Sequence, residues 1–228
     1  MVLFGARNCI TCVSALEDPH ALENVEDNLM VMNAFELACL RSGYKQIAGI
    51  DEAGRGALAG PVIAAAVILP IHCDIKGLRD SKQLSPKQRA RLFDEIHNVA
   101  VSVGVGAADH QIIDRSNILK ATLLAMQEAV EKLIPQPDYL LVDGLDLPKV
   151  GIVGEAIPKG DSRSYSIAAA SIIAKITRDR LMIEADRSYP NYGFPKHKGY
   201  PTSQHRQAIA QFGASEIHRL TFKLLPDD

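Results

Sequence analysis

The chain has 228 residues, of which 47% are hydrophobic and 23% are charged, and its formal net charge is -2. This composition is typical of a globular protein with one substantial core, and it excludes a protein that is basic throughout. The longest apolar run, residues 58–71, contains a proline and falls short of the roughly 20 residues that span a bilayer. Since the N-terminus also lacks the pattern of a secretory signal, we expect a cytoplasmic protein that does not enter the membrane.

The first 31 residues differ from the rest of the chain. They lack a steady periodicity and carry one basic residue against five acidic ones. We interpret residues 1–31 as an N-terminal extension that is a candidate for disorder, and we predict one folded domain over residues 32–228. Cys9 and Cys12 form a CxxC pair in the extension, but no second pair follows to complete a tetrahedral zinc site, so we expect no metal role for them.

The first half of the predicted domain combines strands and helices. A helical pattern of apolar residues covers residues 32–43. Two strands are predicted next, over residues 46–54 and 61–69, because small and β-branched residues lie between turns rich in glycine. Residues 84–100 begin with a serine N-cap and a proline and keep one apolar face, which predicts a helix. A third strand follows over residues 100–108.

The second half continues in the same way. Residues 117–134 place apolar side chains at helical spacing and are followed by prolines, which predicts a second long helix. Residues 138–144, DYLLVDG, are predicted to form a fourth strand. After a short apolar segment at residues 152–157, a helix rich in small residues begins at about Tyr165 and is expected to pack closely on the sheet. Strands covered by helices predict an α/β fold with a mixed sheet.

Acidic residues stand where these strands or the following loops end: Asp51, Glu52, Asp143 and Asp161. Sites of α/β proteins gather at strand ends, so these side chains can converge although they are far apart in the sequence. Close carboxylates repel one another unless a cation neutralises them, and oxygen ligands favour Mg²⁺ or Mn²⁺. A pair of such ions, about 3.5 to 4 Å apart, can support phosphodiester hydrolysis. The alternative is that each aspartate simply caps a turn.

Six sequence blocks, in the same order, closely resemble ribonuclease HII, the type 2 ribonuclease H family. They are GIDEAGRGALAGPVIAAAVILP, DSKQLS, NILKATLLAM, LLVDG, KGDSRSYSIAAASIIAKITRDRLM and YPNYGFPKHKGYPT. The resemblance covers about residues 45–213; Ala57 stands where the family usually has proline, and the acidic extension lies outside it. It implies a ribonuclease H-like fold, with a mixed central sheet flanked by helices and a helical C-terminal part.

The resemblance also implies an activity. The family hydrolyses the phosphodiester on the 5′ side of a ribonucleotide, in RNA/DNA hybrids or in DNA with embedded ribonucleotides, and leaves a 3′-hydroxyl. It implies that Asp51, Glu52, Asp143 and Asp161 are the catalytic residues and bind Mn²⁺ or Mg²⁺. We therefore expect an endoribonuclease that removes ribonucleotides in DNA replication and repair, with a nucleic-acid duplex as its partner and a monomeric state.

The GRG turn offers a way to recognise ribose. Gly54 and Gly56 lack a Cβ atom, so the backbone of Gly54, Arg55 and Gly56 can approach a 2′-hydroxyl, the group that distinguishes RNA from DNA. The resemblance assigns the turn this role, and it implies that Tyr200 stacks on the sugar of the following deoxynucleotide. The alternatives are a tight turn between two strands for the glycines and ordinary packing for the tyrosine.

Supporting substrate contacts are expected from a few polar side chains: Lys82, Asn117, Lys175, Lys196 and Lys198. Lysines there would contact phosphates without reading sequence, and the segment from Lys175 to Arg206 has a local charge of +4. Asn117 matches a family position close to the nucleic acid, yet it is equally suited to be a helix N-cap.

Other charged residues receive simpler interpretations. Arg178 and Arg180 are candidates for phosphate contacts, with Asp179 as their ion-pair partner rather than a further metal ligand. His218, like the two other histidines without a partner evident in the sequence, His97 and His110, is predicted to lie on the surface.

Three other functions remain to be weighed. Ribonuclease HIII shares the acidic residues but carries a large N-terminal substrate-binding domain, for which the roughly 40 residues before the first strand are too few. A catalytically inactive hybrid-binding protein is disfavoured because all four acids are present. Another carboxylate-metal nuclease of similar fold, such as an exonuclease, would cut from strand ends instead of at an internal ribonucleotide.

Overall fold

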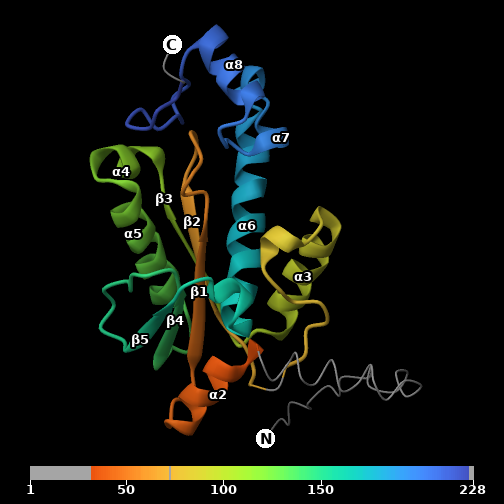
Figure 1. Ribbon diagram of the computed structural model, residues 1–228, viewed down its shortest axis with the longest axis vertical. Helices are drawn as coiled ribbons and strands as arrows, with labels where there is room; N and C mark the ends of the chain where they lie inside the picture. The colour runs from red at the N-terminus through yellow and green to blue at the C-terminus, as the bar shows by residue number, and fades with distance from the viewer. Residues whose placement is uncertain (1–31, 72, 226–228) are drawn as a thin grey trace, which may run out of the picture.

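The computed structural model describes residues 32–71 and 73–225. At its centre lies a five-stranded sheet in the order β3-β2-β1-β4-β5 (Figure 1). The strands are β1 (Ile47–Ala53), β2 (Val62–Ile68), β3 (Ser102–Ala108), β4 (Tyr139–Asp143) and β5 (Gly154–Ile157). β2 is antiparallel to β1 and β3, whereas β4 is parallel to β1 and β5. The predicted mixed sheet is confirmed, while the extension with Cys9 and Cys12 lies outside the described residues.

Helices cover both faces of this sheet. They are α2 (Ala34–Arg41), α3 (Pro86–Val99), α4 (His110–Arg115), α5 (Ile118–Glu131), α6 (Tyr165–Ala185), α7 (Phe194–His197) and α8 (Ser203–Phe212). α4 and α5 lie on one side of the sheet, and α6 with α3 lies on the other (Figure 1). α7 and α8 lie beyond one end of the sheet, which confirms the helical C-terminal part. Among the described residues, no helix combines the length and apolar character that crossing a membrane requires.

The core is divided by the sheet into two layers. Every residue of β2 is buried, because its alternate side chains face α5 on one side and α6 on the other. α6 approaches β1 very closely: a Cβ atom on Gly49 would lie 2.1 Å from the carbonyl carbon of Ser166. Small residues on both elements therefore fix where α6 begins, next to the acidic end of β1.

Local signals explain most of the helix ends. Ser85 and Gln88 form a capping box at the start of α3, with Pro86 at the first helical position, as the sequence predicts. β5 corresponds to the apolar segment at residues 152–157, which the sequence did not identify as a strand. It has only four residues and is defined by parallel pairing with β4, a contact that sequence periodicity does not reveal.

Candidate active site

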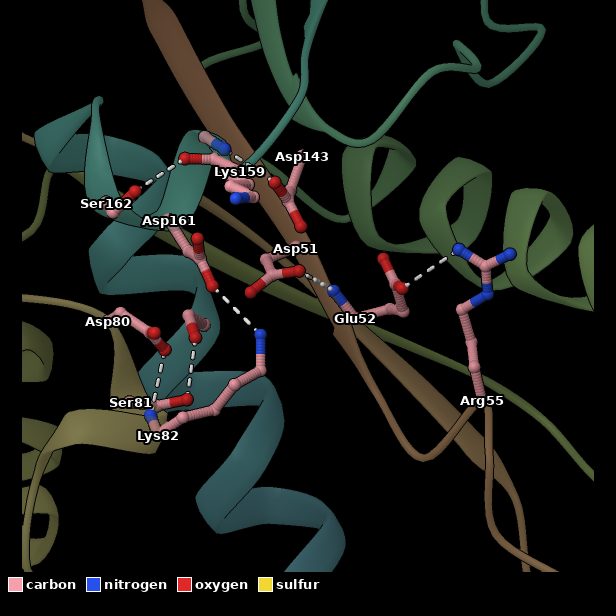
Figure 2. Close-up of polar contacts among 12 residues, drawn as sticks. Asp51, Glu52, Arg55, Asp80, Ser81, Lys82, Asp143, Lys159, Asp161 and Ser162 are labelled. Atoms are coloured by element: carbon pink, nitrogen blue, oxygen red, sulfur yellow. Dashed lines mark hydrogen bonds and ion pairs between the residues drawn. The ribbon is translucent and has the colours of Figure 1, made fainter.

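Three of the four predicted acidic residues converge. β1 and β4 run side by side with Ile50 opposite Val142, so the next residue of each strand, Asp51 and Asp143, lies at the same edge of the sheet. The 3₁₀ turn η2 (Gly160–Ser162) adds Asp161. One carboxylate oxygen from each aspartate lies within 4.8 Å of the others, and Figure 2 shows the three groups directed toward one another.

Glu52 lies at the margin of this cluster. Successive side chains of a strand point to opposite faces, so Glu52 is turned away from the face that carries Asp51. Its Oε1 atom lies 3.4 Å from Nη1 of Arg55 in the GRG turn (Figure 2). Glu52 is still near enough for its charge to raise the pKa of Asp51.

The cluster carries negative charge that its surroundings do not fully neutralise. Burial raises the pKa of Asp51 well above its ordinary value, and the charges of Glu52 and Asp143 raise it further. Burial also raises the pKa of Asp143, with an added contribution from the charge of Asp161. Three buried or half-buried carboxylates within reach of one ion form a donor set of the type that Mg²⁺ and Mn²⁺ prefer. The residues therefore fit a divalent cation.

Lys82 contributes a cation to the site. Its Nζ atom lies 3.0 Å from Oδ2 of Asp161. Burial lowers the pKa of Lys82, but the bond to Asp161 and the nearby negative charges outweigh that effect and raise it, so this lysine is charged at neutral pH. The preceding turn is held in place because Asp80 accepts a hydrogen bond from the Lys82 backbone, at 2.8 Å, and Ser81 bonds to Ser171 of α6, at 2.7 Å.

Asp161 is placed by the turn that follows β5. The backbone N–H of Gly160 donates to Oδ1 of Asp143, at 2.6 Å, which ties the two acidic segments together. A Cβ atom on Gly160 would lie 2.6 Å from Cδ1 of Ile167, so a side chain here would require the end of the Ile167 side chain to move. The turn thus connects Asp143 to Asp161 through its backbone.

The GRG turn follows directly from the acidic end of β1. Gly54 has φ +99°, and a Cβ atom there would lie 2.0 Å from Nε of Arg178. Gly56 is exposed, and a Cβ atom there would meet nothing within 4 Å. The requirement for glycine at Gly54 is therefore conformational, whereas Gly56 leaves bare backbone at the surface beside the acids.

Tyr200 lies in a loop bonded to this region. The backbone N–H of Leu58 donates to the carbonyl of Gly199, at 2.8 Å. The Tyr200 ring lies 5.6 Å from Nζ of Lys175 and 5.2 Å from Cζ of Arg178, distances typical of cation–π contacts. The acids, the GRG turn and Tyr200 thus come from different segments that meet at one end of β1.

The comparisons with known proteins decide the family. A family model described as ribonuclease HII matches residues 48–225. The chain belongs to the ribonuclease HII family. A ribonuclease HII of Geobacter sulfurreducens is 60% identical over 83% of this chain and 87% of that protein. A ribonuclease HII of Acetivibrio thermocellus is 54% identical over 84% of this chain and 75% of that protein.

Solved structures agree with this assignment. The crystal structure of ribonuclease H2 from Pyrococcus horikoshii has a TM-score of 0.67 and 27% identity, covering 79% of this chain and 95% of that one. The ribonuclease H-like fold expected from the resemblance is confirmed. Because the matching family is ribonuclease HII, the alternative assignments considered from the sequence are not favoured.

Some predicted substrate contacts are placed differently from expectation. Arg178 is fully buried and bonds to backbone carbonyls, so the prediction that it contacts phosphates is wrong. Arg180 lies over the ring of Phe93, 4.3 Å from its centroid. Asp179 does form an ion pair, but its partner is Lys175, at 2.7 Å, rather than the arginines.

Other predicted contacts lie at the surface. The side chain of Asn117 is the N-cap of α5 and accepts from the backbone of Lys120, at 2.9 Å, which confirms the capping interpretation. Lys196 is exposed. Lys198 has φ +53° and directs its Nζ atom to the carbonyl of Pro195.

Sequence reasoning missed a chain of buried histidines. His218 was predicted to lie on the surface, but it is only 1% exposed. Its Nε2 atom lies 3.1 Å from Nε2 of His205, and the His205 ring stacks on His197 with centroids 4.4 Å apart. These residues lie 8 and 13 positions apart, a spacing that matches neither a helix nor a strand, so no local pattern identifies the cluster.

Proposed function

We propose that this chain is a metal-dependent endoribonuclease that cuts on the 5′ side of a ribonucleotide and leaves a 3′-hydroxyl. Its substrates would be RNA/DNA hybrids and DNA duplexes with embedded ribonucleotides. The observation that carries this proposal is the convergence of Asp51, Asp143 and Asp161 within 4.8 Å, directly beside an exposed backbone turn. Membership of the ribonuclease HII family supports the same activity.

The acidic residues would hold Mn²⁺ or Mg²⁺. Asp51, Asp143 and Asp161 would bind the cation directly, with Glu52 joining them from the margin of the cluster. When bound, divalent ions activate water and stabilise the leaving oxygen in phosphodiester hydrolysis. The Asp51 side chain is buried and is also oriented by a hydrogen bond. Its Oδ1 atom accepts the Glu52 backbone N–H at 2.7 Å.

The neighbouring residues would orient the substrate. The backbone of Gly54, Arg55 and Gly56 would meet the 2′-hydroxyl of the ribonucleotide, while Tyr200 would stack on the next deoxyribose. The substrate phosphates that flank the ribonucleotide would contact the polar and basic residues around the site: Lys82, Asn117, Lys175, Lys196 and Lys198. Because Lys82 is bonded to Asp161, it lies where substrate phosphate and acidic cluster would meet.

The proposal extends to the whole chain. The catalytic domain would comprise residues 32–228, with residues 1–31 as an appended extension. The protein would act as a monomer in the cytoplasm, removing ribonucleotides during DNA replication and repair.

One experiment tests the activity. A labelled DNA duplex containing a single ribonucleotide is incubated with the protein and Mg²⁺ or Mn²⁺, and the product ends are mapped. We expect one cut on the 5′ side of the ribonucleotide, with a 3′-hydroxyl, and no cut in the same duplex made only of DNA. Binding without cleavage in either metal would support an inactive hybrid-binding protein, and degradation from the strand ends would support an exonuclease.

A further inference from the structure

Two arginines are buried beneath the GRG turn. Arg178 of α6 and Arg219 of the C-terminal segment are both 0% exposed. Within the described part of the chain, neither forms an ion pair with a carboxylate. Burial lowers the pKa of both guanidinium groups, and the charge of Arg178 lowers that of Arg219 further. Buried charges are normally paired with an opposite charge, so burying two adjacent cations without a carboxylate partner is costly.

Backbone carbonyls take the place of the missing carboxylates. Arg178 donates to the carbonyls of three residues: Ala59 at 3.1 Å, Pro61 at 2.9 Å and Lys198 at 3.0 Å. Arg219 donates to Gly60, at 3.0 Å, and to Arg55 of the GRG turn, at 2.9 Å. The two arginine side chains therefore connect three segments by hydrogen bonds: the GRG turn, residues 59–61 and the loop that leads to Tyr200.

The bond to Arg55 determines how the turn faces solvent. In a trans peptide the C=O of one residue and the N–H of the next point in opposite directions, and the Arg55–Gly56 bond is not among the cis bonds of the described chain. Since Arg219 holds the Arg55 carbonyl toward the interior, the N–H of Gly56 faces outward. Neither Arg55 nor Gly56 donates a backbone hydrogen bond to another described residue.

We propose that Arg219 is a positioning residue for ribose recognition: by holding the Arg55 carbonyl inward, it presents the Gly56 N–H to the substrate's 2′-hydroxyl. Arg178 supports it by fixing the adjacent loop at Ala59 and Pro61. The inference rests on the proposed function, because it concerns how that activity would discriminate ribose from deoxyribose. It assigns specificity to a buried residue that cannot touch the nucleic acid.

A purely structural role makes a different prediction. The C-terminal segment is also joined to the loop after the GRG turn by the Arg219 backbone, which donates to Leu58 at 2.8 Å. If the Arg219 side chain only strengthened this attachment, its replacement would reduce the fraction of folded enzyme and hence the apparent kcat. The preference for a ribonucleotide over a deoxyribonucleotide would not change, because each folded molecule would keep its turn.

The test uses the full chain with Mn²⁺ and two duplexes of identical sequence. KM is measured on the duplex with one ribonucleotide, and Ki is measured for the all-DNA duplex as a competitor. For Arg219→Lys, which keeps the charge but loses the planar fork, we expect the Ki/KM ratio to fall about tenfold, the effect of roughly one hydrogen bond in the complex. A ratio equal to that of the wild-type protein would overturn the inference.

Arg206→Lys is the matched control. Arg206 donates to the carbonyls of Lys223, at 3.2 Å, and Leu224, at 2.6 Å, so it has the same chemistry away from the GRG turn. Its replacement should leave the ratio unchanged, and an equal fall there would contradict the assignment to Arg219. If circular dichroism shows Arg219→Lys to be unfolded, Arg219→Gln is tested for the same fall, and a wild-type ratio there overturns the inference.

The wild-type protein distinguishes a failure of the proposed activity from a failure of the role assigned to Arg219. If the wild-type protein neither cleaves the ribonucleotide duplex nor prefers it to DNA, the proposed function fails, and the inference that rests on it fails too. If the wild-type preference is present and persists in the folded Arg219 variants, only the inference fails.

Discussion

The two glycines of the GRG turn have separate requirements. Gly54 needs a positive φ and has Arg178 where a side chain would lie, whereas Gly56 faces open space. The sequence indicates only that both glycines would permit a close approach. It does not distinguish them, because Arg178 lies far along the chain.

Substitution of Gly54 should mainly reduce stability, whereas substitution of Gly56 should mainly reduce cleavage. Gly54→Ala should lower the free energy of unfolding by about 1–2 kcal/mol from backbone strain alone, with a further loss from the clash. Gly56→Val should melt like the wild-type protein yet lose cleavage by at least roughly tenfold, because its side chain blocks the ribose. Thermal melting and cleavage rates check both; a fully active Gly56→Val would refute backbone reading of the 2′-hydroxyl.

Tyr200 should matter most at a junction between RNA and DNA. Tyr200→Phe keeps a stacking ring and should be mild, whereas Tyr200→Ala should lower cleavage of a single embedded ribonucleotide about tenfold, given the usual strength of stacking. The measurement is the ratio of that rate to the rate on a continuous RNA strand paired with DNA. Equal losses on both substrates would make Tyr200 a packing residue without a role in reading the junction.

At the scale of elements, local signals predicted most of the fold. Alternating and small apolar residues identified β1 and β2, and a capping box identified the start of α3. The rule that sites form at strand ends predicts from the sequence that Asp51 and Asp143 lie together. The prediction included Asp161 as well, although the η2 turn and the Gly160 contact with Asp143, which bring it to the cluster, are not evident in the sequence.

Tertiary contacts account for what the sequence did not reveal. Arg219 bonds to Arg55 across 164 positions, and His218 is buried against His205 of α8. A single arginine or histidine in the sequence has no periodicity that indicates burial. Arginine is normally exposed and histidine is intermediate in burial, so the surface prediction for His218 failed at a site where neutral partners surround the ring.

The buried histidines should make the C-terminal helical part sensitive to acid. His218 accepts the Ser215 backbone N–H at Nδ1, at 2.9 Å, and therefore donates from Nε2 to His205. His205 in turn faces the carbonyl of Tyr200 with Nδ1, at 3.0 Å. Both rings are neutral in this arrangement. Burial, the main cause, lowers the pKa of each to about 4.

The direction of the pH dependence follows from proton binding in the folded and unfolded states. Unfolded histidines take up a proton near pH 6.5, whereas the folded rings resist it until about pH 4, so stability falls as pH drops through this window. Between pH 7 and pH 5 the loss is up to about 2 kcal/mol for each histidine. Urea unfolding at pH 7 and pH 5 measures this loss in the wild-type protein and in a double variant that carries His205→Gln and His218→Gln.

The comparison between the two proteins isolates the histidines. The acid cluster has raised pKa values, so its protonation favours the folded state as pH falls. That contribution is common to both proteins and cancels in their difference. The variant should lose less stability on acidification than the wild-type protein; an identical pH dependence would mean that the rings are already accessible to protons.

At the scale of the whole molecule, charge is distributed unevenly. The net charge is -2, yet the segment from Lys175 to Arg206 is basic. Replacing Lys196 and Lys198 by Ala should weaken binding to plain and ribonucleotide-bearing duplexes alike. The slope of log affinity against log salt should decrease by about one for each phosphate contact removed. An unchanged slope would remove these lysines from the binding face.

The central claim is that the acidic cluster at the end of β1 and β4 binds the metal that cleavage requires. Its most direct test is the Mn²⁺-dependent cleavage rate of the single-ribonucleotide duplex by the wild-type protein and by Asp143→Asn. The fold of Asp143→Asn is checked by its melting temperature without metal. This temperature should not fall below that of the wild-type protein, because the substitution removes one of the mutually repelling charges. We expect no cleavage by the wild-type protein in EDTA and at least a roughly hundredfold lower rate for Asp143→Asn. A folded Asp143→Asn that cleaves at nearly the wild-type rate would contradict the account.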